Sequence, residues 1–170
     1  MAQPLTAHFQ SLGRYNTLAN RILYAACAEL GDAGRKQVRP AFFKSIHGTL
    51  NHIMVGDRIW LARFEGGEAP STHLDAILYE EFAALREARQ AEDARIEAFM
   101  AGLDEGLLDG AIRYVNNEGN RHEDPMPLLL AHFFNHQTHH RGQVHDMLCQ
   151  TDVPPPVLDM HRVLRPGPVG

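Results

Sequence analysis

Apolar residues recur at helical spacing along four long stretches of the chain. The spacing predicts helices over residues 5–30, 41–65, 74–103 and 127–150, because positions three, four and seven apart lie on one face of a helix. Glycine and proline residues occupy the connectors between these stretches, and both residue types end helices readily. We therefore expect four long helices as the main elements of the fold.

The third stretch differs from the others because its outer face is highly charged. Its charged residues are Glu80, Glu81, Arg86, Glu87, Arg89, Glu92, Asp93, Arg95 and Glu97. A run of mixed sign is typical of a solvent-exposed helix face and does not indicate a binding patch. We expect these side chains to face water.

Residues 111–127 interrupt the helical pattern before the last long helix. Apolar and polar residues alternate from Ile112 to Asn116 and a turn sequence, NEGN, follows, which predicts a short hairpin at one end of the helices. The proline-rich TDVPPPV ends the last long helix, and one more turn is expected at 157–164. Together these features predict an all-α, four-helix bundle with a hairpin-like insertion, in a single domain over residues 1–170.

Composition and charge argue against several classes of protein. The net charge of −5 and the pI near 6.1 disfavour a phosphate-binding surface, since nucleic-acid binders concentrate Lys and Arg in a basic patch. No stretch reaches the ~18 uncharged apolar residues of a membrane span, and the N-terminus lacks a signal-peptide pattern. We expect a cytoplasmic protein that binds neither nucleic acid nor membrane, with Cys27 and Cys149 as thiols of the core.

Histidine is the compositional anomaly, with 11 in 170 residues, and four of them lie in the segment NHQTHHRGQVH. Each residue of a helix advances ~100°, which places His136 and His140 within ~60° of the apolar centre of their helix. His132 and His139 lie nearer the edge of that face, and His145 points away from it. An i, i+4 pair directs two imidazoles at one point, so His136 and His140 are the predicted metal ligands.

A third ligand should come from another helix, and residues 41–65 offer two histidines. Periodicity alone does not choose between His47 and His52. His52 shares its side of the helix with Ser45, Thr49 and Gly56, which are small enough to leave room for a metal ion and a ligand. We therefore favour His52.

Asp57 lies within the apolar stripe of the same helix, where an unpaired carboxylate would cost several kcal/mol. It requires a partner, either an Asn or Arg from a neighbouring helix or the outer nitrogen of a ligand histidine. Asn16 and Asn20, one turn apart in the first helix, suggest a similar contact between helices.

Three segments taken together resemble the DinB family: YNTLANRIL near the start, HGTLNHIMVGDRIWLARF in the second helix and HFFNHQTHHRGQVHDML in the last. The resemblance covers nearly the whole chain in order, and NHQTHHRGQ is its most specific part. It implies a four-helix bundle, often dimeric, that holds a divalent metal ion through His52, His136 and His140. A homodimer is therefore expected.

Three imidazole ligands leave coordination positions open, as in catalytic zinc sites. Such a site suits zinc, nickel, iron or manganese, and we favour zinc or nickel. Relatives of the DinB family include transferases that use low-molecular-weight thiols such as bacillithiol or mycothiol. The resemblance thus favours thiol S-transfer to an electrophile, with Arg141 as a candidate contact for an anionic group of the cofactor.

Two other functions remain open at this point. A metal-dependent hydrolase would need a general base, for which Asp57, His139 and Gln143 are the candidates. A non-enzymatic metal-binding stress-response protein would use the site for stability or sensing. A purely structural site should find a fourth protein ligand, and the sequence offers only His132 or His139.

Overall fold

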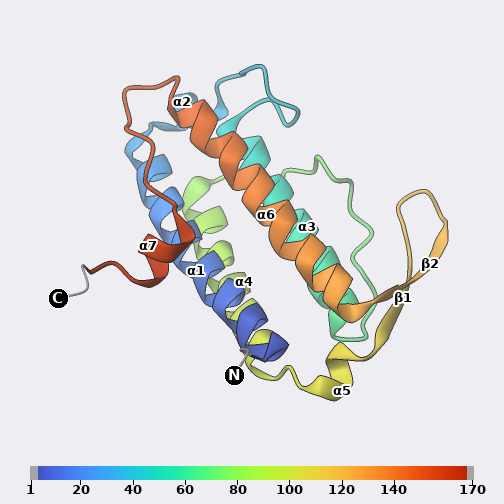
Figure 1. Cartoon of the computed structure of the whole chain (residues 1–170). Helices are drawn as coiled ribbons and strands as arrows, with labels where there is room; N and C mark the ends of the chain where they lie inside the picture. Colours follow the sequence, from blue (N-terminus) through green and yellow to red (C-terminus); the bar gives the residue numbers. More distant parts are fainter. Residues whose placement is uncertain (1–3, 168–170) are drawn as a thin grey trace.

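The computed structural model describes residues 4–167, which form seven helices and one two-stranded sheet (Figure 1). The long helices are α1 (Leu5–Glu29), α3 (Ile46–Phe64), α4 (Phe82–Ala101) and α6 (Met126–Leu148), and the short ones are α2 (Asp32–Lys36), α5 (Glu105–Leu108) and α7 (Met160–Leu164). The expectation of a mostly helical chain is confirmed. The predicted domain of residues 1–170 includes 1–3 and 168–170, which lie outside the described residues.

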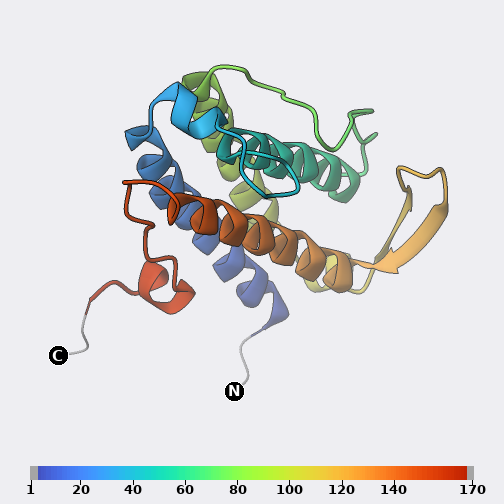
Figure 2. The same cartoon turned by 90° about the horizontal axis from the view of Figure 1, so that it is seen from above.

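The four long helices each pass two apolar clusters, and α1 and α6 meet these clusters in the opposite order to α3 and α4. One cluster contains Leu23, Leu50, Leu85 and Val144, and the other contains the equivalent apolar residues at the opposite ends of the same helices. Helices α1 and α6 therefore run one way, and α3 and α4 run the other. Helix α1 packs on α4 and α6, and α3 packs on α6 and α4, as Figures 1 and 2 show from two sides.

A layer of buried polar side chains separates the two apolar clusters. Its members come from all four long helices, and we call them the polar layer: Asn16, Asn20, Asp57, Arg89, Asp93, Gln137 and Arg141. The expectation that Arg89, Glu92 and Asp93 face water was wrong, because all three are buried. The sequence pattern of the helix did not show that Asn20 of α1 would bond to Asp93 or that Asp57 of α3 would pair with Arg89.

Helix α4 begins at Phe82, eight residues later than the expected start at 74. The connector before it bonds to α3 instead of forming a helix of its own. The amide N–H of Tyr79 donates to Asn51 Oδ1 at 3.0 Å, and the Tyr79 carbonyl accepts from the Asn51 amide at 3.3 Å and from His47 Nε2 at 2.9 Å. Helix α3 begins at Ile46, five residues after the expected start, because the Ser45 side chain caps it by accepting the Gly48 N–H.

The predicted hairpin is present as strands β1 (Ala111–Val115) and β2 (Arg121–Pro125), paired antiparallel beside the start of α6. Gly119 occupies the turn with a φ of +85°, which glycine adopts without strain. The expected turn in the tail corresponds to α7, which lies against α1 in Figure 2. The Tyr15 hydroxyl fixes this tail by donating to the Leu158 carbonyl at 2.7 Å.

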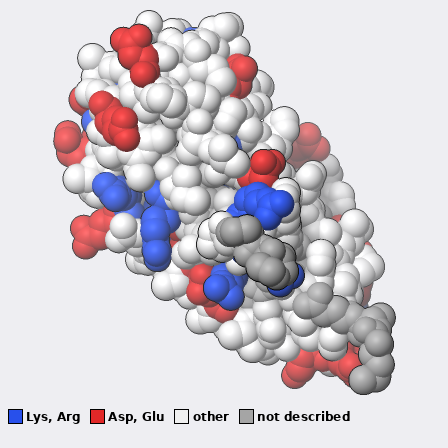
Figure 3. Space-filling model, turned by 60° about the vertical axis from the view of Figure 1, so that its left-hand side comes forward, with Lys and Arg blue, Asp and Glu red and all other residues white. Residues whose placement is uncertain are grey.

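Surface features agree only in part with the expectations. Among the described residues, no helix combines the length and apolar character needed to cross a membrane. The face shown in Figure 3 carries acidic and basic side chains near one another. Cys27 is a buried free thiol, but Cys149 is exposed, because it follows the last residue of α6 where the helix leaves the core.

Candidate metal centre

Three imidazoles from two helices converge on one point. His136 and His140 lie one turn apart on α6, and His52 faces them from α3. His52 Nε2 lies 3.0 Å from His136 Nε2 and 3.1 Å from His140 Nε2, and the candidate ligand atoms of all three lie within 4.8 Å of one another. We call these residues the histidine cluster. The residue choices made from the sequence are therefore brought together by the fold.

Hydrogen bonds at the outer nitrogens fix the protonation of two of these rings. His52 Nδ1 lies 2.7 Å from the Leu74 carbonyl oxygen, which can only accept a hydrogen bond. In the neutral ring Nδ1 therefore carries the proton, and Nε2 carries a lone pair. His140 Nδ1 lies 2.8 Å from Gln143 Oε1, which gives His140 the same tautomer. Two lone pairs thus face each other at 3.1 Å. This contact between neutral rings is repulsive and becomes favourable only with a cation between them.

The environment of the cluster disfavours a proton as that cation. Burial and then the neighbouring imidazoles lower the pKa of His136 to about 3. Burial likewise lowers the pKa of His140 to about 4, and it lowers the pKa of His52. All three rings are therefore neutral near pH 7, which is the form that binds metal ions.

The spacing of the three Nε2 atoms suits a divalent metal ion. Nitrogens bound ~2.1 Å from one ion lie ~3.0 to 3.4 Å apart when the angle between the bonds is ~90 to 110°. The two measured separations of 3.0 and 3.1 Å agree with this range. The His52 and His140 outer nitrogens also have the hydrogen-bond partners that orient metal-binding histidines. The cluster could therefore hold a divalent metal ion.

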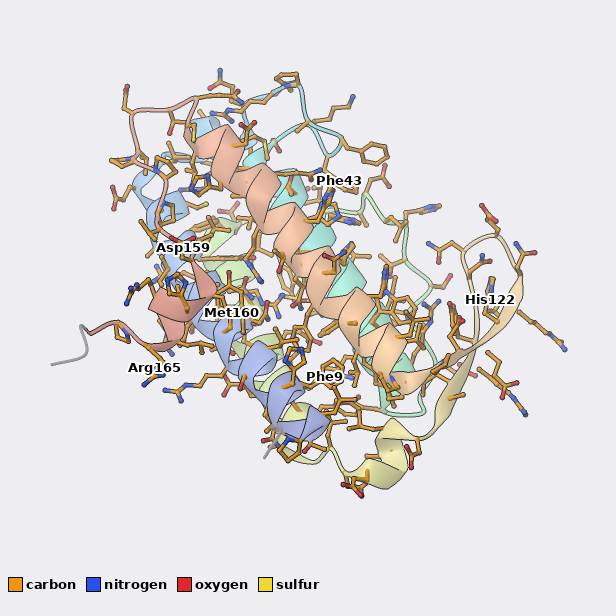
Figure 4. All side chains as sticks on the ribbon, in the orientation of Figure 1. Phe9, Phe43, His122, Asp159, Met160 and Arg165 are labelled. Carbon is orange, nitrogen blue, oxygen red and sulfur yellow. The ribbon has the colours of Figure 1, made fainter. Side chains whose placement is uncertain are left out.

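Packing around the cluster leaves little freedom for its rings. The Phe43 ring, which is labelled in Figure 4, stacks on His52 with centroids 3.7 Å apart and an angle of 15° and meets His140 edge to face. Lys44, the next residue, has a φ of 66°, an uncommon conformation for a residue with a side chain. A Cβ atom on Gly56 would lie 2.7 Å from His136 Cε1, so only glycine leaves room for this ring. The small residue noted in the sequence makes space for a ligand ring.

A cavity of about 500 Å³ opens beside the cluster. His52 and His136 form part of its lining, and Trp60 and Arg63 extend it along α3. Its outer wall comes from the hairpin, on which Tyr114 and His122 also line the space; Figure 4 shows His122 on this hairpin. We call this cavity the histidine pocket. It gives a small molecule access to the open side of the cluster.

The remaining histidines of α6 have other surroundings. His132 is exposed, lines the histidine pocket and meets the Trp60 ring edge to face at 5.2 Å. His139 is exposed, and its Nε2 lies 3.1 Å from the amide nitrogen of Gln143, whose oxygen holds His140. His145 is half-buried and is not part of the cluster.

His47, the alternative third ligand, is used elsewhere, because its Nε2 donates to the Tyr79 carbonyl. This bond helps to hold the connector before α4 against α3. His52 is therefore the histidine of α3 that faces the α6 pair.

Two candidates for chemistry belong instead to the polar layer. Asp57 is fully buried, pairs with Arg89 at 2.5 Å and accepts from Gln137 at 2.8 Å. An arginine partner from a neighbouring helix was one of the expected solutions. Arg141, the candidate contact for an anionic group of the cofactor, is buried and donates to Asn16 and Asn20. Neither side chain lines the histidine pocket.

The pKa values in the polar layer reflect its paired charges. Burial would lower the pKa of Arg89, but Asp57 and Asp93 reverse this and raise it. Burial raises the pKa of Asp93 to about 6 against the opposing effect of Arg89. Asn16 and Asn20 both donate to the same Asp93 oxygen, at 3.2 and 2.9 Å. The layer thus compensates its charges within the chain.

Sequence reasoning missed several residues that surround the histidine cluster and line its pocket. Arg63 lies eleven positions after His52, which is close to three turns of a helix, so the same facing argument would have found it. Phe43 and Tyr114 reach the site from a loop and a strand, and no helical spacing relates them to the histidines.

The fold and site together define a helical protein with a three-histidine cluster suited to a divalent metal ion. The sequence matches the DinB family over residues 1–167, so this chain belongs to that family. It is also similar to Protein DinB of Bacillus subtilis (strain 168), with 28% identity over 149 residues that cover 82% of this chain and 83% of the relative. The resemblance recognised from the sequence motifs is confirmed.

Proposed function

We propose that His52, His136 and His140 bind a divalent metal ion and that the protein is a metal-dependent transferase for a low-molecular-weight thiol. The observation that carries this proposal is the convergence of three Nε2 atoms beside an open pocket, with His52 Nε2 3.0 Å from that of His136 and 3.1 Å from that of His140. When bound, such an ion would lower the pKa of a thiol and favour its thiolate form. Zinc or nickel is the preferred ion, and iron or manganese also suits three imidazoles.

The chain's own residues would divide the remaining tasks. The Leu74 carbonyl and Gln143 hold His52 and His140 in the tautomer that presents Nε2. Phe43 covers one side of His52 and limits water there, while the histidine pocket leaves another side accessible. In the transfer, the thiol sulfur would form a bond to an electrophilic carbon, the leaving group would depart with its electron pair, and the thiol proton would pass to solvent.

The arrangement gives less support to hydrolysis. A hydrolase needs a general base beside the attacking water. Asp57 is engaged by Arg89 and Gln137, and Gln143 is a neutral amide, so neither suits that role. His139 is exposed and bonded to Gln143. A non-enzymatic metal-binding role is also less favoured, because a purely structural site would not need an adjoining cavity.

Metal analysis tests the ligands directly. Protein purified without chelators should contain about one metal ion per chain, and His136→Ala or His140→Ala should lose it. His145→Ala is the matched control, since it removes a histidine of α6 outside the cluster and should retain the metal. Unchanged metal content in the two ligand variants would exclude the proposed site.

Turnover measurements then test the reaction class. The metal-loaded protein should conjugate an electrophile only when a small thiol is present, and His136→Ala should lose this activity. Ester or amide cleavage without thiol, absent in the same variant, would instead identify a hydrolase. Absence of both activities would favour the metal-binding stress-response role.

Assembly and architecture complete the proposal. We propose that the four long helices form the bundle implied by the DinB resemblance and that the protein is a cytoplasmic homodimer. Family membership supports these points. Sedimentation equilibrium tests the dimer, which requires a mass near twice the 19.0 kDa of one chain.

A further inference from the structure

Among the described residues, Arg63 is the one Lys or Arg that lines the histidine pocket. It lies on α3, eleven positions after His52, with Gly56 and Trp60 between them on the same side of the helix. Eleven residues correspond to ~16 Å along a helix axis. The histidine pocket thus has the histidine cluster at one end and the positive charge of Arg63 at the other.

The charge of Arg63 has no acidic partner among the described residues. Its Nη2 donates to the Val115 carbonyl at 2.8 Å, and its guanidinium lies 4.7 Å from the ring centres of both Trp60 and Tyr114. The other half-buried arginines of the long helices differ, since Arg58 and Arg95 each contact a carboxylate. Two aromatic rings therefore hold Arg63 in place without neutralising it.

The remaining charge of the pocket lies at its rim. Glu118 is the one carboxylate of the lining, and it is exposed and accepts from the side chain of Asn120 at 3.1 Å. It forms no ion pair with Arg63 among the described residues. An incoming anion would thus be the first carboxylate or phosphate to pair with this guanidinium, whose planar donors suit either group.

We propose that Arg63 binds the anionic end of an elongated thiol whose sulfur lies at the histidine cluster. The inference rests on the proposed function and adds the substrate class. Long side chains of a helix lean toward its N-terminus, and the Arg63 guanidinium accordingly lies 4.7 Å from the ring centre of Trp60, which is nearer His52 along the helix. The distance to be spanned is then roughly 10 to 15 Å, about the length of an extended tripeptide or somewhat more.

Matched synthetic thiols test this assignment without relying on turnover. The protein is loaded with Co²⁺, and thiol binding is followed by the charge-transfer absorption of the cobalt thiolate. Mercaptooctanoate and mercaptooctanol have the same length and differ in charge at the far end, and mercaptopropionate keeps the carboxylate but is too short to reach Arg63. We expect the affinity for mercaptooctanoate to be at least about tenfold higher than the affinity for either of the other two thiols.

Variants at Arg63 then assign the preference to this residue. Arg63→Gln should reduce the preference for mercaptooctanoate over mercaptooctanol to near one and leave cobalt content unchanged. Arg63→Lys keeps the charge without the planar fork and should retain part of the preference. Arg86→Gln is the matched control, because Arg86 is exposed on α4 and does not line this pocket.

The outcomes distinguish the two proposals. Equal binding of the charged and uncharged long thiols, or a preference that survives in Arg63→Gln, would overturn the inference and leave the thiol function standing. Equal binding of the short and long carboxylates would overturn the predicted length. If no thiol produces the absorption in cobalt-loaded wild-type protein, the proposed function itself fails, and the role of Arg63 fails with it.

Discussion

Helix α6 contributes to two polar clusters through two neighbouring pairs of residues. His136 and His140 belong to the histidine cluster, while Gln137 and Arg141, each one position later, belong to the polar layer. In the polar layer every charged side chain has a partner inside the chain. In the histidine cluster, lone pairs face one another and a pocket opens beside them. Facing lone pairs and an adjoining pocket, more than burial, distinguish the candidate metal site from the polar layer.

The largest effect on this contrast should come from Arg89→Met, which removes the central cation of the polar layer. Asp57 and Asp93 would then lie buried without their partner, and we expect the free energy of unfolding to fall by about 3 to 5 kcal/mol. Urea denaturation measures this change. Arg86→Met, on the exposed face one turn earlier, should change it by less than ~0.5 kcal/mol. A similar small loss for Arg89→Met would show that the polar layer does not depend on its ion pairs.

Gly56→Ala should separate metal binding from stability. The new methyl group would lie 2.7 Å from His136 Cε1 and displace the ring, so metal affinity should fall about 10- to 100-fold. Gly142→Ala is the matched control on α6, because a Cβ there meets nothing within 4 Å; it should keep the affinity and stabilise the helix by ~1 kcal/mol. Metal competition with a chromophoric chelator gives both affinities. Equal affinities in the two variants would show that the close packing of His136 is not required.

Acidification should affect the two clusters in opposite directions, with the smallest and most gradual change. The unfolded chain protonates its histidines near pH 6.5, whereas the native pKa values of His136 and His140 are about 3 and about 4. The cluster's contribution to stability is thus complete above pH 6.5 and is lost as the pH falls toward 4. Asp93 has a native pKa of about 6, so its contribution to the stability of the fold is instead lost as the pH rises from 3.8 through 6.

Thermal denaturation of metal-free protein between pH 7 and 4 isolates the histidine contribution. The double variant His136→Gln with His140→Gln should lose less stability on acidification than wild-type protein does. Identical slopes would mean that the native rings protonate as readily as those of the unfolded chain. Burial and the neighbouring imidazoles would then not lower the pKa values of His136 and His140 in the folded protein.

Helical spacing located most of the histidine cluster because its two α6 members lie one turn apart on a recognisable face. The choice of His52 over His47 needed the family resemblance as well. The actual reason lies in tertiary structure, since His47 bonds to Tyr79, 32 residues away, and this same contact delays the start of α4. Local patterns contain no information about such a partner.

Burial of charged residues was the main feature that the sequence pattern misplaced. Arg89 and Asp93 lie one turn apart on α4, and their spacing equally suits an exposed i, i+4 pair. Their burial depends on Asp57 and Asn20 arriving from other helices. The hairpin was predicted, but its role as a wall of the histidine pocket depends on how it folds back beside α3.

If the histidine cluster binds a metal ion as proposed, the position of His52 would give that ion a mechanical role as well. His52 and His136 are 84 positions apart, so an ion that joins them closes a loop of about half the chain. Chain-entropy arguments for crosslinks assign a loop of this size on the order of 4 to 5 kcal/mol. Loss of the ion would then loosen α3 from α6, and the protein's resistance to unfolding would report the availability of metal.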